Sequence, residues 1–401
     1  MYPLPNRRNR RIIILASLIF ILLSFLVLYL TYLFIQETQP EQSSSEAPQA
    51  FSASDYSYVR PTMFQGSTVE LAWFYKPPSD GNIEVLSENF SRFVLTKNDE
   101  SERDTLYAQG VNTPILRYLR IDAIQNPGDC TSQPLRNQIA DRPGEFCEIR
   151  DNHPEWFMRT SSGALITGAD GFVYMDPGNV EWRQYFLDRM AESQQLDGWF
   201  GIFFDNVEAS LAKRERSGAL PGDYLGEIAY QNAIAGFLEY LRINYFVPTG
   251  EPVYANIIEL RDERVWFRYL ESLDGAMSEN WSVDWNDEYL SPERWLWHMN
   301  IAETTQAQGK HMLSVAQGQA LDNKRQQFAF ASYLLINWGN ASFRYTNAGT
   351  YDSTWLYDNY RIPLGDPVGA RYEQDGWWIR EFANGYVGVN PETYQSVIET
   401  P

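Results

Sequence analysis

The sequence is poor in the residue types on which several classes of site depend. It has three histidines, His153, His298 and His311, and no two of them stand at the spacing of a metal-binding pair. Zinc sites use closely spaced sets of histidine and cysteine ligands, and two cysteines are too few for a disulfide scaffold. We therefore expect neither a metal nor a cofactor.

Basic residues are also scarce. The chain has 32 Lys and Arg against 52 Asp and Glu, a formal net charge of −20, and residues 1–36 hold four arginines and no acid. The remainder would be repelled by duplex DNA and by anionic lipid surfaces, so we expect no nucleic-acid partner. A composition of 44% hydrophobic and 21% charged residues excludes a disordered or collagen-like chain and supplies enough apolar residues for a large core.

The N-terminal segment carries a long apolar run. Residues 12–34 contain no charge and no proline and directly follow the four arginines. A helix of this length crosses a hydrocarbon core of roughly 30 Å, whereas the apolar part of a cleavable signal peptide, the competing interpretation, has about 7–15 residues. We expect a cytoplasmic basic tail at residues 1–11 and a single transmembrane helix at residues 12–35 that anchors the protein in the lipid bilayer.

The positive-inside rule places the rest of the chain outside the cell. Residues 36–65 are rich in Ser, Pro, Gln and Ala and predict a flexible linker. In an oxidising exterior Cys130 and Cys147 can form a disulfide, and two unpaired thiols are the alternative. The predicted localisation is the cell membrane, with a single membrane pass and an extracellular folded domain.

From residue 71 onward, short apolar runs alternate with amphipathic helical stretches. The apolar runs predict eight strands, at residues 71–75, 92–96, 115–121, 199–204, 253–257, 276–278, 312–315 and 342–345. The amphipathic stretches predict helices at residues 180–195, 224–244, 264–272, 292–309 and 324–337. Ser291 and Asp322 supply N-caps, and Gly309 and Gly339 close helix ends.

Near-continuous apolar strands that alternate with helices predict a parallel sheet covered on both faces. Eight such units indicate a (β/α)₈ TIM barrel, which we assign to residues 66–350. The alternative, an open doubly wound sheet, would carry a glycine-rich phosphate turn after its first strand, where residues 76–80 read KPPSD instead. Residues 351–401 predict a C-terminal extension with a β-hairpin around Asn384 and Gly385 that packs on the barrel.

Active sites of (β/α)₈ barrels lie at the carboxyl ends of the strands. Asp205 ends an aromatic-rich run, where a carboxylate is poorly solvated. Such a carboxylate is expected to be catalytic or to have a bonding partner, and the alternative is that Asp205 caps a helix. Glu279 follows the sixth strand beside Trp281, and Glu is a poor N-cap residue, which leaves a surface ion pair as its alternative role. Both strands point side chains toward the barrel axis, so the two carboxylates are expected to converge.

Two carboxylates that face one cleft are what glycosidic cleavage requires, one as a neutral acid and one as an anion. Apolar surroundings would raise the pKa of one of them. Other polar or aromatic residues near the strand ends are candidates for sugar binding: Trp73, Tyr75, Asp122, Asn206, Asn256, Trp281, Gln317 and Arg344. Most Trp in a barrel are nevertheless core residues, and Asp122 has an ion pair with Arg120 or Arg117 as its alternative role.

Four segments resemble the glycoside-hydrolase-like TIM barrels, in particular the group called glycosyl-hydrolase-like family fifteen. They are HPEWF at residues 153–157 with Gly163, MDPGNVEW at residues 175–182, DGWFGIFFDN at residues 197–206 and REFANGYVGVNP at residues 380–391. The segments occur in the order found in that group, and the resemblance covers about residues 70–392.

The resemblance implies a (β/α)₈ fold and action on a glycan. By analogy with retaining barrels, it implies that Asp205 on strand four is the nucleophile and Glu279 on strand six the acid/base. Strand five departs from the starch-degrading pattern, because it ends in Asn256 and has Glu259 three residues further on. Glu259 therefore remains a rival acid, and Glu208 is a second one.

The predicted function is a membrane-anchored extracellular glycoside hydrolase that cleaves a poly- or oligosaccharide with two carboxylates and no metal. The first alternative is an inactive barrel that binds glycans at the cell surface. The second is another hydrolytic or lyase chemistry, such as deacetylation, which usually needs a metal or a Ser-His pair.

Overall fold

The computed structural model describes residues 69–285 and 287–400. The predicted cytoplasmic tail, transmembrane helix and linker lie outside these residues. Within the described ranges, no helix is both long enough and apolar enough to cross a bilayer.

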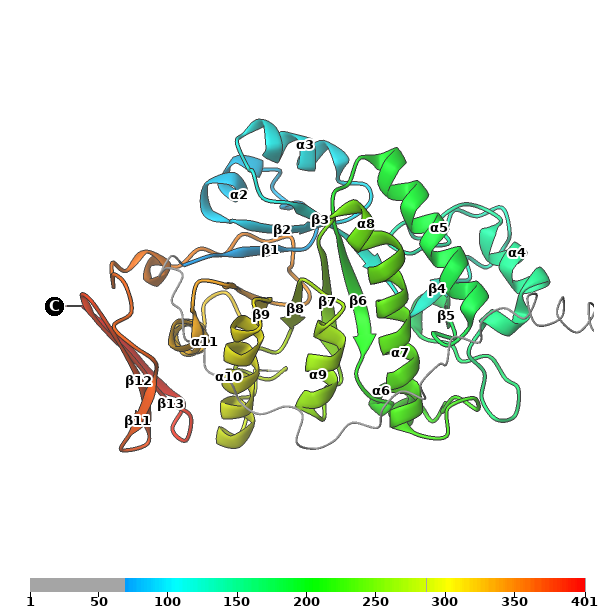
Figure 1. Cartoon of the computed structure of the whole chain (residues 1–401). Helices are drawn as coiled ribbons and strands as arrows, with labels where there is room; N and C mark the ends of the chain where they lie inside the picture. The colour runs from blue at the N-terminus through cyan, green and yellow to red at the C-terminus, as the bar shows by residue number, and fades with distance from the viewer. Residues whose placement is uncertain (1–68, 286, 401) are drawn as a thin grey trace, which may run out of the picture. The chain divides into compact units, whose positions relative to one another are not determined.

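Eight parallel strands form the barrel (Figure 1). In their order around the sheet they are β1 (Ala72–Phe74), β2 (Arg92–Leu95), β3 (Ile115–Arg120), β6 (Ile202–Glu208), β7 (Val253–Ile258), β8 (Gly275–Ser278), β9 (His311–Gln317) and β10 (Ala341–Thr346). A parallel bridge between Leu71 and Phe343 joins the first strand to the last and closes the sheet. The predicted (β/α)₈ barrel and its eight strands are confirmed.

Helices cover the outside of the barrel between successive strands. They include α2 (Ile83–Asn89), α3 (Glu100–Ala108), α5 (Val180–Asp197), α7 (Glu227–Leu241), α9 (Glu263–Leu270), α10 (Pro292–Ala307) and α11 (Asn323–Ile336). The five predicted helices are α5, α7, α9, α10 and α11, and the predicted caps Ser291 and Asp322 accept backbone N–H bonds at the starts of α10 and α11. Helix α7 continues through a π-helical segment, η3 (Arg242–Phe246), into α8 (Val247–Thr249).

A long insertion separates β3 from β6. It contains a two-stranded antiparallel pair, β4 (Ala123–Gln125) and β5 (Phe172–Tyr174), with α4 (Glu145–Asn152) and two short 3₁₀ helices, η1 (Pro154–Trp156) and η2 (Ala169–Gly171), between the strands. A disulfide joins Cys130 to Cys147 within the insertion. A further short helix, α6 (Ala212–Ser217), follows β6.

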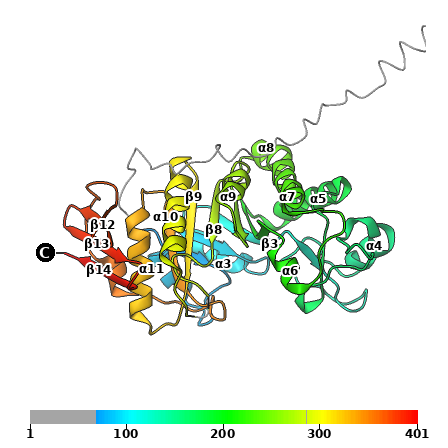
Figure 2. The same ribbon diagram turned by 90° about the horizontal axis from the view of Figure 1, so that it is seen from below.

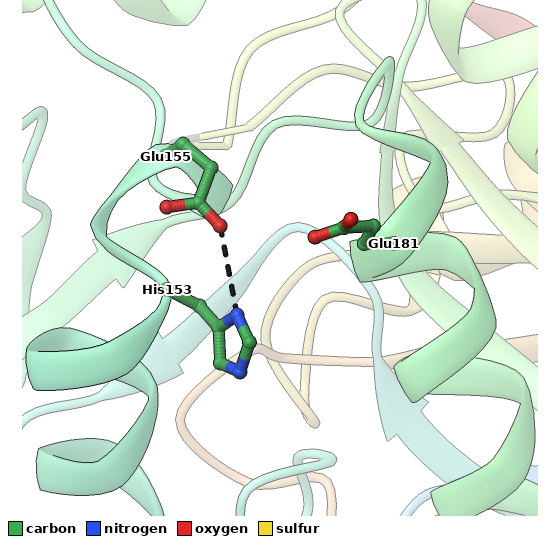
Figure 3. Close-up of side chains that lie close together, drawn as sticks. All are labelled: His153, Glu155 and Glu181. Atoms are coloured by element: carbon green, nitrogen blue, oxygen red, sulfur yellow. Dashed lines mark ion pairs between the residues drawn. The ribbon is translucent and has the colours of Figure 1, made fainter.

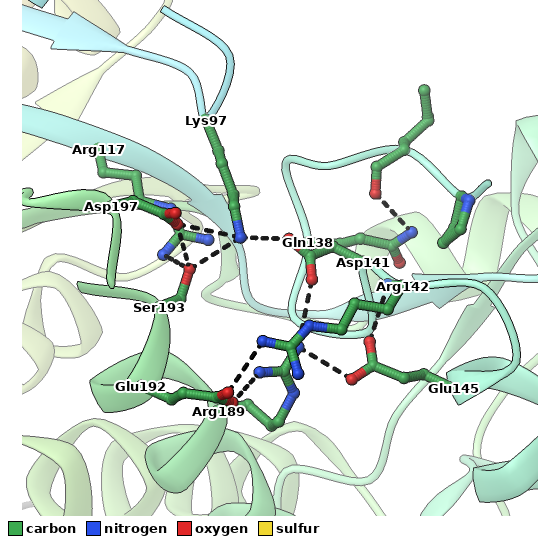
Figure 4. Close-up of polar contacts among 12 residues, drawn as sticks. Lys97, Arg117, Gln138, Asp141, Arg142, Glu145, Arg189, Glu192, Ser193 and Asp197 are labelled. Carbon is green, nitrogen blue, oxygen red and sulfur yellow. Dashed lines mark hydrogen bonds and ion pairs between the residues drawn. The ribbon is translucent and has the colours of Figure 1, made fainter. Parts of the chain in front are cut away.

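A buried ionic network ties this insertion to the barrel (Figure 4). Lys97, which follows β2, lies 2.7 Å from Asp141 of the insertion and 3.0 Å from Asp197 at the end of α5. Arg189 of α5 lies 3.2 Å from Asp141 and 2.9 Å from Glu145. The first Asp of the DGWFGIFFDN segment therefore has a structural ion-pair role.

The C-terminal extension forms a four-stranded antiparallel sheet. Its strands are β11 (Tyr372–Gln374), β12 (Trp377–Phe382), β13 (Gly385–Asn390) and β14 (Gln395–Glu399), and β12 and β13 are the expected hairpin. Figures 1 and 2 show this sheet beside α11, which it contacts. The buried Arg380 donates hydrogen bonds to the carbonyls of Leu334 and Asn337, so the extension packs directly on the barrel helices.

Candidate active site

A β-bulge in β6 positions the first carboxylate. The pairing of β6 with β7 shifts register between Phe204 and Val207, so Asp205 and Asn206 together lie opposite Asn256. Asn206 has φ 62°, a left-handed conformation that asparagine tolerates better than most residues. Bulges of this kind redirect side chains next to active sites. Asp205 consequently lies within β6, whereas the sequence predicted that the strand ends just before it.

One amide group links the two predicted catalytic carboxylates. The side-chain nitrogen of Asn256 donates one hydrogen bond to Asp205 Oδ1 at 3.0 Å and another to Glu279 Oε2 at 2.8 Å. The two N–H bonds of an amide diverge by about 120°, so the two acceptor oxygens are about 5 Å apart. The structure thus brings Asp205 and Glu279 face to face, and both side chains are partly exposed.

Three tyrosines surround this pair. The hydroxyl of Tyr118 donates a hydrogen bond to Asp205 Oδ2, and that of Tyr351 donates one to Glu279 Oε1. The ring of Tyr75 stacks on that of Tyr118 with centroids 4.8 Å apart and lies 5.5 Å from Tyr351. Each carboxylate is therefore held by a phenol on one oxygen and by the Asn256 amide on the other.

The environment raises the pKa of Glu279 to about 7. Burial is the main cause because it disfavours the charged form, and the negative charge of Asp205 adds to it, while hydrogen bonds from Tyr351 and Asn256 act in the opposite direction. The pKa values of Tyr118 and Tyr351 are raised by burial and by the neighbouring carboxylates. Both phenols consequently stay protonated and act as donors at neutral pH.

A cavity of about 600 Å³ opens beside Glu279. This volume lies in the range of small-molecule sites. Its walls carry four tryptophans, three arginines and several other polar residues, among them Trp266, Trp281, Trp285, Trp297, Arg216, Arg261, Arg294, Glu259, His298, Asn206 and Asn256. Flat aromatic rings next to polar groups suit the apolar faces and the hydroxyls of a sugar.

The predicted sugar-binding residues fall into two groups. Asn206, Asn256 and Trp281 line the cavity, and Tyr75 lies over the phenols that hold the carboxylates. The remaining four, Trp73, Asp122, Gln317 and Arg344, do not line the cavity and are buried.

Trp73 and Arg344 are structural, contrary to the prediction. Trp73 is fully buried in the core, and the guanidinium of Arg344 lies 3.9 Å from the centre of its ring. Arg344 also donates a hydrogen bond of 2.6 Å to the carbonyl of Tyr351. Neither side chain lines the cavity, and Arg344 supports the loop that carries Tyr351.

Gln317 and Asp122 also bond within the protein. The amide of Gln317 donates to the carbonyl of Glu279 and to the hydroxyl of Tyr351, both at 3.0 Å, so it positions the site without reaching substrate. Asp122 accepts a hydrogen bond of 2.6 Å from Arg120, which is the ion pair considered as the alternative.

Neither rival acid fits the role of proton donor. Glu208 is fully buried and pairs with Arg214 at 2.8 Å, so it has no route to a substrate. Glu259 lines the cavity but pairs through both oxygens with Arg216, whose hydrogen bonds lower the pKa of that carboxyl. A carboxyl with a lowered pKa stays ionised at neutral pH and cannot donate a proton.

Tyr118, Tyr351 and Arg294 were not predicted as site residues. Alternation along β3 gave a signal for Tyr118, because Leu116 two residues earlier also packs inside the barrel. Tyr351 and Arg294 lie in a loop and near a helix start, and nothing in the local sequence shows that they reach the site.

A separate cluster of His153, Glu155 and Glu181 lies at the surface (Figure 3). Its ligand atoms are within 4.8 Å of one another, with His153 Nδ1 at 3.5 Å from Glu155 Oε1. A cation would fit this geometry, which the spacing of the histidines did not predict. Exposed acidic groups often cluster without an ion, and none of the three residues lines the cavity beside Glu279.

The model of a family described as hypothetical glycosyl hydrolase family 15 matches residues 130–386, which is more than half of the chain. The chain belongs to this family. The match confirms the resemblance that the four sequence segments indicated. It spans most of the insertion, the strands β6 to β10, and β11 and β12 of the C-terminal sheet. No curated protein matches the chain.

Several solved structures are distantly similar. The glycoside hydrolase domain of PelA from Pseudomonas aeruginosa has 17% identity and a TM-score of 0.47, over 73% of this chain and 98% of that one. The maltogenic α-amylase AmyB from Thermotoga neapolitana has 11% identity and a TM-score of 0.45, over 80% and 86% of the two chains. An α-amylase from Malbranchea cinnamomea has 10% identity and a TM-score of 0.45, over 81% and 85%.

Proposed function

We propose that this member of the family is a retaining glycoside hydrolase in which Asp205 is the nucleophile and Glu279 the acid/base. The observation that carries the proposal is the amide of Asn256, which bonds both carboxylates and holds the two acceptor oxygens about 5 Å apart. Retaining enzymes have carboxyls about 5–5.5 Å apart, and inverting enzymes need about 6.5–9.5 Å to admit a water.

The proposed reaction has two steps. In the first, Glu279 gives its proton to the leaving glycosidic oxygen while Asp205 attacks the anomeric carbon and forms a glycosyl ester. In the second, Glu279, now ionised, takes a proton from water, and the water oxygen displaces Asp205. The pKa of about 7 supports Glu279 as the acid, because a useful share of it is protonated at neutral pH.

The structure offers little support for the deacetylation alternative. His311 bonds Ser342 at 2.8 Å, but both residues are buried near the starts of β9 and β10, at the opposite end of the barrel from Glu279. His298 is also buried, and burial lowers its pKa to about 3. His153 lies at the surface in the cluster described above.

We also propose that residues 12–35 anchor the enzyme in the cell membrane with the barrel outside. The apolar run and its flanking arginines support this proposal. The disulfide between Cys130 and Cys147 is consistent with an oxidising compartment.

Incubation of the full chain with a panel of polysaccharides, followed by an assay for new reducing ends, tests the hydrolase. Asp205→Asn and Glu279→Gln should each lower the rate by orders of magnitude with an unchanged circular dichroism spectrum, whereas Glu259→Gln serves as a control and should keep most of the activity. Proton NMR of the first product should show the anomer of the substrate. Full activity in either carboxylate variant would refute the assignment, and binding without cleavage by the wild type would favour the inactive glycan-binding barrel.

A further inference from the structure

Three arginines line the cavity beside Glu279, and two of them are neutralised within the protein. Arg216 pairs with Glu259, and Arg261 pairs with Glu215 at 2.7 Å and with Glu227 at 2.6 Å. These guanidinium groups are committed to structural ion pairs. They leave little positive charge for a ligand.

The third arginine, Arg294, differs from the other two. Among residues 69–285 and 287–400, no carboxylate lies within ion-pair distance of its guanidinium. One nitrogen donates to the carbonyl of Leu260 at 2.8 Å, and the guanidinium lies 3.7 Å from the centre of the Trp297 ring. Trp297 is itself held by a 2.7 Å hydrogen bond to Glu263. Arg294 is therefore a half-buried cation, fixed in place, with donors to spare.

Two buried polar groups on the same cavity also lack partners. Trp281 is 0% exposed and His298 is 5% exposed, and neither the indole N–H of Trp281 nor Nδ1 of His298 has a hydrogen-bond partner among the described residues. A buried polar group without a hydrogen bond is destabilising, so a ligand oxygen or a water that bonds these two nitrogens would stabilise the site. His298 stands four residues after Arg294 on α10, and side chains with this spacing share one helix face.

Arginine suits one class of ligand group especially well. Its planar fork of N–H donors matches the two oxygens of a carboxylate, and such charge-assisted bonds are about twice as strong as neutral ones. The indole and imidazole nitrogens nearby suit neutral oxygens, such as the hydroxyls of a sugar. The three groups together match a sugar that carries both.

We propose that the cavity beside Glu279 is a subsite for a uronic acid, with Arg294 binding the sugar carboxylate and Trp281 and His298 bonding its hydroxyls. The inference deepens the proposed function, because it names the substrate class of that site, but the binding itself does not depend on cleavage.

The test compares methyl glucuronide with methyl glucoside, which differ only in a carboxylate against a hydroxymethyl group, and repeats the comparison with the galactose-configured pair. Binding to the full chain is measured by ligand-observed NMR, with acetate as a control for the free anion. In at least one of the two pairs the uronide should bind about tenfold tighter than the neutral glycoside, as expected for a charge-assisted hydrogen bond.

Substitution of Arg294 then identifies the group responsible. Arg294→Met should reduce uronide affinity to that of the neutral glycoside without changing the latter, and Arg294→Lys should retain part of the preference. Arg261→Met is the matched control, because Arg261 lines the same cavity but is already paired, and it should keep the full preference. Tryptophan fluorescence and circular dichroism verify folding, and the Lys variant supplies the result if the Met variant does not fold.

Equal affinity for acid and neutral sugar in both pairs, no uronide binding at all, or a preference that survives Arg294→Met would each overturn the inference. Tighter binding of the 6-sulfate or 6-phosphate of methyl glucoside would also overturn it, because the site would then recognise another anion. The proposed function fails in a different way: the preference would remain while no glycan is cleaved. Conversely, cleavage without the preference would remove only this inference.

Discussion

The interaction between the two carboxylates gives the sharpest test of the site. Asp205→Asn removes a negative charge about 5 Å from Glu279 while it keeps the size of the side chain. At this distance and an effective dielectric constant of about 20–40, the repulsion between two carboxylates is about 2–3 kcal/mol. The pKa of Glu279, about 7 in the wild type, should therefore fall by roughly 1–2 pH units. Burial, the larger cause of the shift, remains and keeps it above its usual value.

The pKa of Glu279 is measured by carbon-13 NMR titration of glutamate carboxyls, with its signal assigned by its absence from Glu279→Gln. Glu259→Gln is the control, because that carboxylate is paired with Arg216 and its removal should change the titration little. In the wild type, kcat/KM should fall as the pH rises above about 7, because the acid loses its proton. An unchanged titration in Asp205→Asn, or activity that is constant well above pH 7, would refute the reasoning.

Three further predictions follow from the same contacts. Tyr351→Phe removes a hydrogen bond that lowers the pKa of Glu279, so that pKa should rise, whereas Asp205→Asn should lower it. The falling limb of the pH profile of kcat/KM should therefore move to higher pH in Tyr351→Phe, and a shift to lower pH would contradict this. The pKa of Glu279 is higher in the folded protein than in the unfolded chain, so the wild type loses stability as the pH rises from the unfolded pKa to about 7. In urea unfolding, Glu279→Gln should therefore be more stable than the wild type by about 1–3 kcal/mol at pH 8 and by less at pH 4. A stability difference that does not depend on pH would argue against burial of this carboxyl. Lys97→Met removes a buried cation that pairs with both Asp141 and Asp197, although Asp141 keeps Arg189, and should lower the free energy of unfolding by about 3–5 kcal/mol. Arg142→Met breaks an exposed pair and should lower it by less than about 1 kcal/mol; equal costs would contradict the burial argument.

The barrel was predictable because its determinants are local. Parallel strands buried on both faces are near-continuous apolar runs, and each run is visible in a few residues of sequence. The structure also contains strands that the sequence did not predict, and these are short or exposed. β4 and β5 have three residues each, β11 is three residues long and exposed, and β14 has five residues of which none is buried. β4 and β5 pair across a long separation in the sequence, and β11 has no buried side chain, so the local sequences of these strands carry little signal.

The errors at the site also have a local cause. Trp73 was assigned to the cleft because it stands near the end of the first strand. Side chains alternate along a strand, and since Ala72 and Phe74 pack inside the barrel, Trp73 points to the other side and into the outer core. Arg344 lies on a strand, as predicted, and Gln317 is the last residue of β9, which the prediction ended at residue 315. Both side chains are buried and support Tyr351.

The amino-acid sequence by itself determined the eightfold alternation, the family, and the location of Asp205 and Glu279 near the carboxyl ends of two strands. These properties depend on the order and spacing of neighbouring residues. Only the tertiary structure decided that one Asn256 amide bonds both carboxylates, that a loop phenol reaches Glu279, and that Arg294 lines the cavity with no acidic ion-pair partner among the described residues. The reason is physical: strand register, a bulge and loop packing bring these groups together from distant positions, and no single stretch of sequence encodes those contacts.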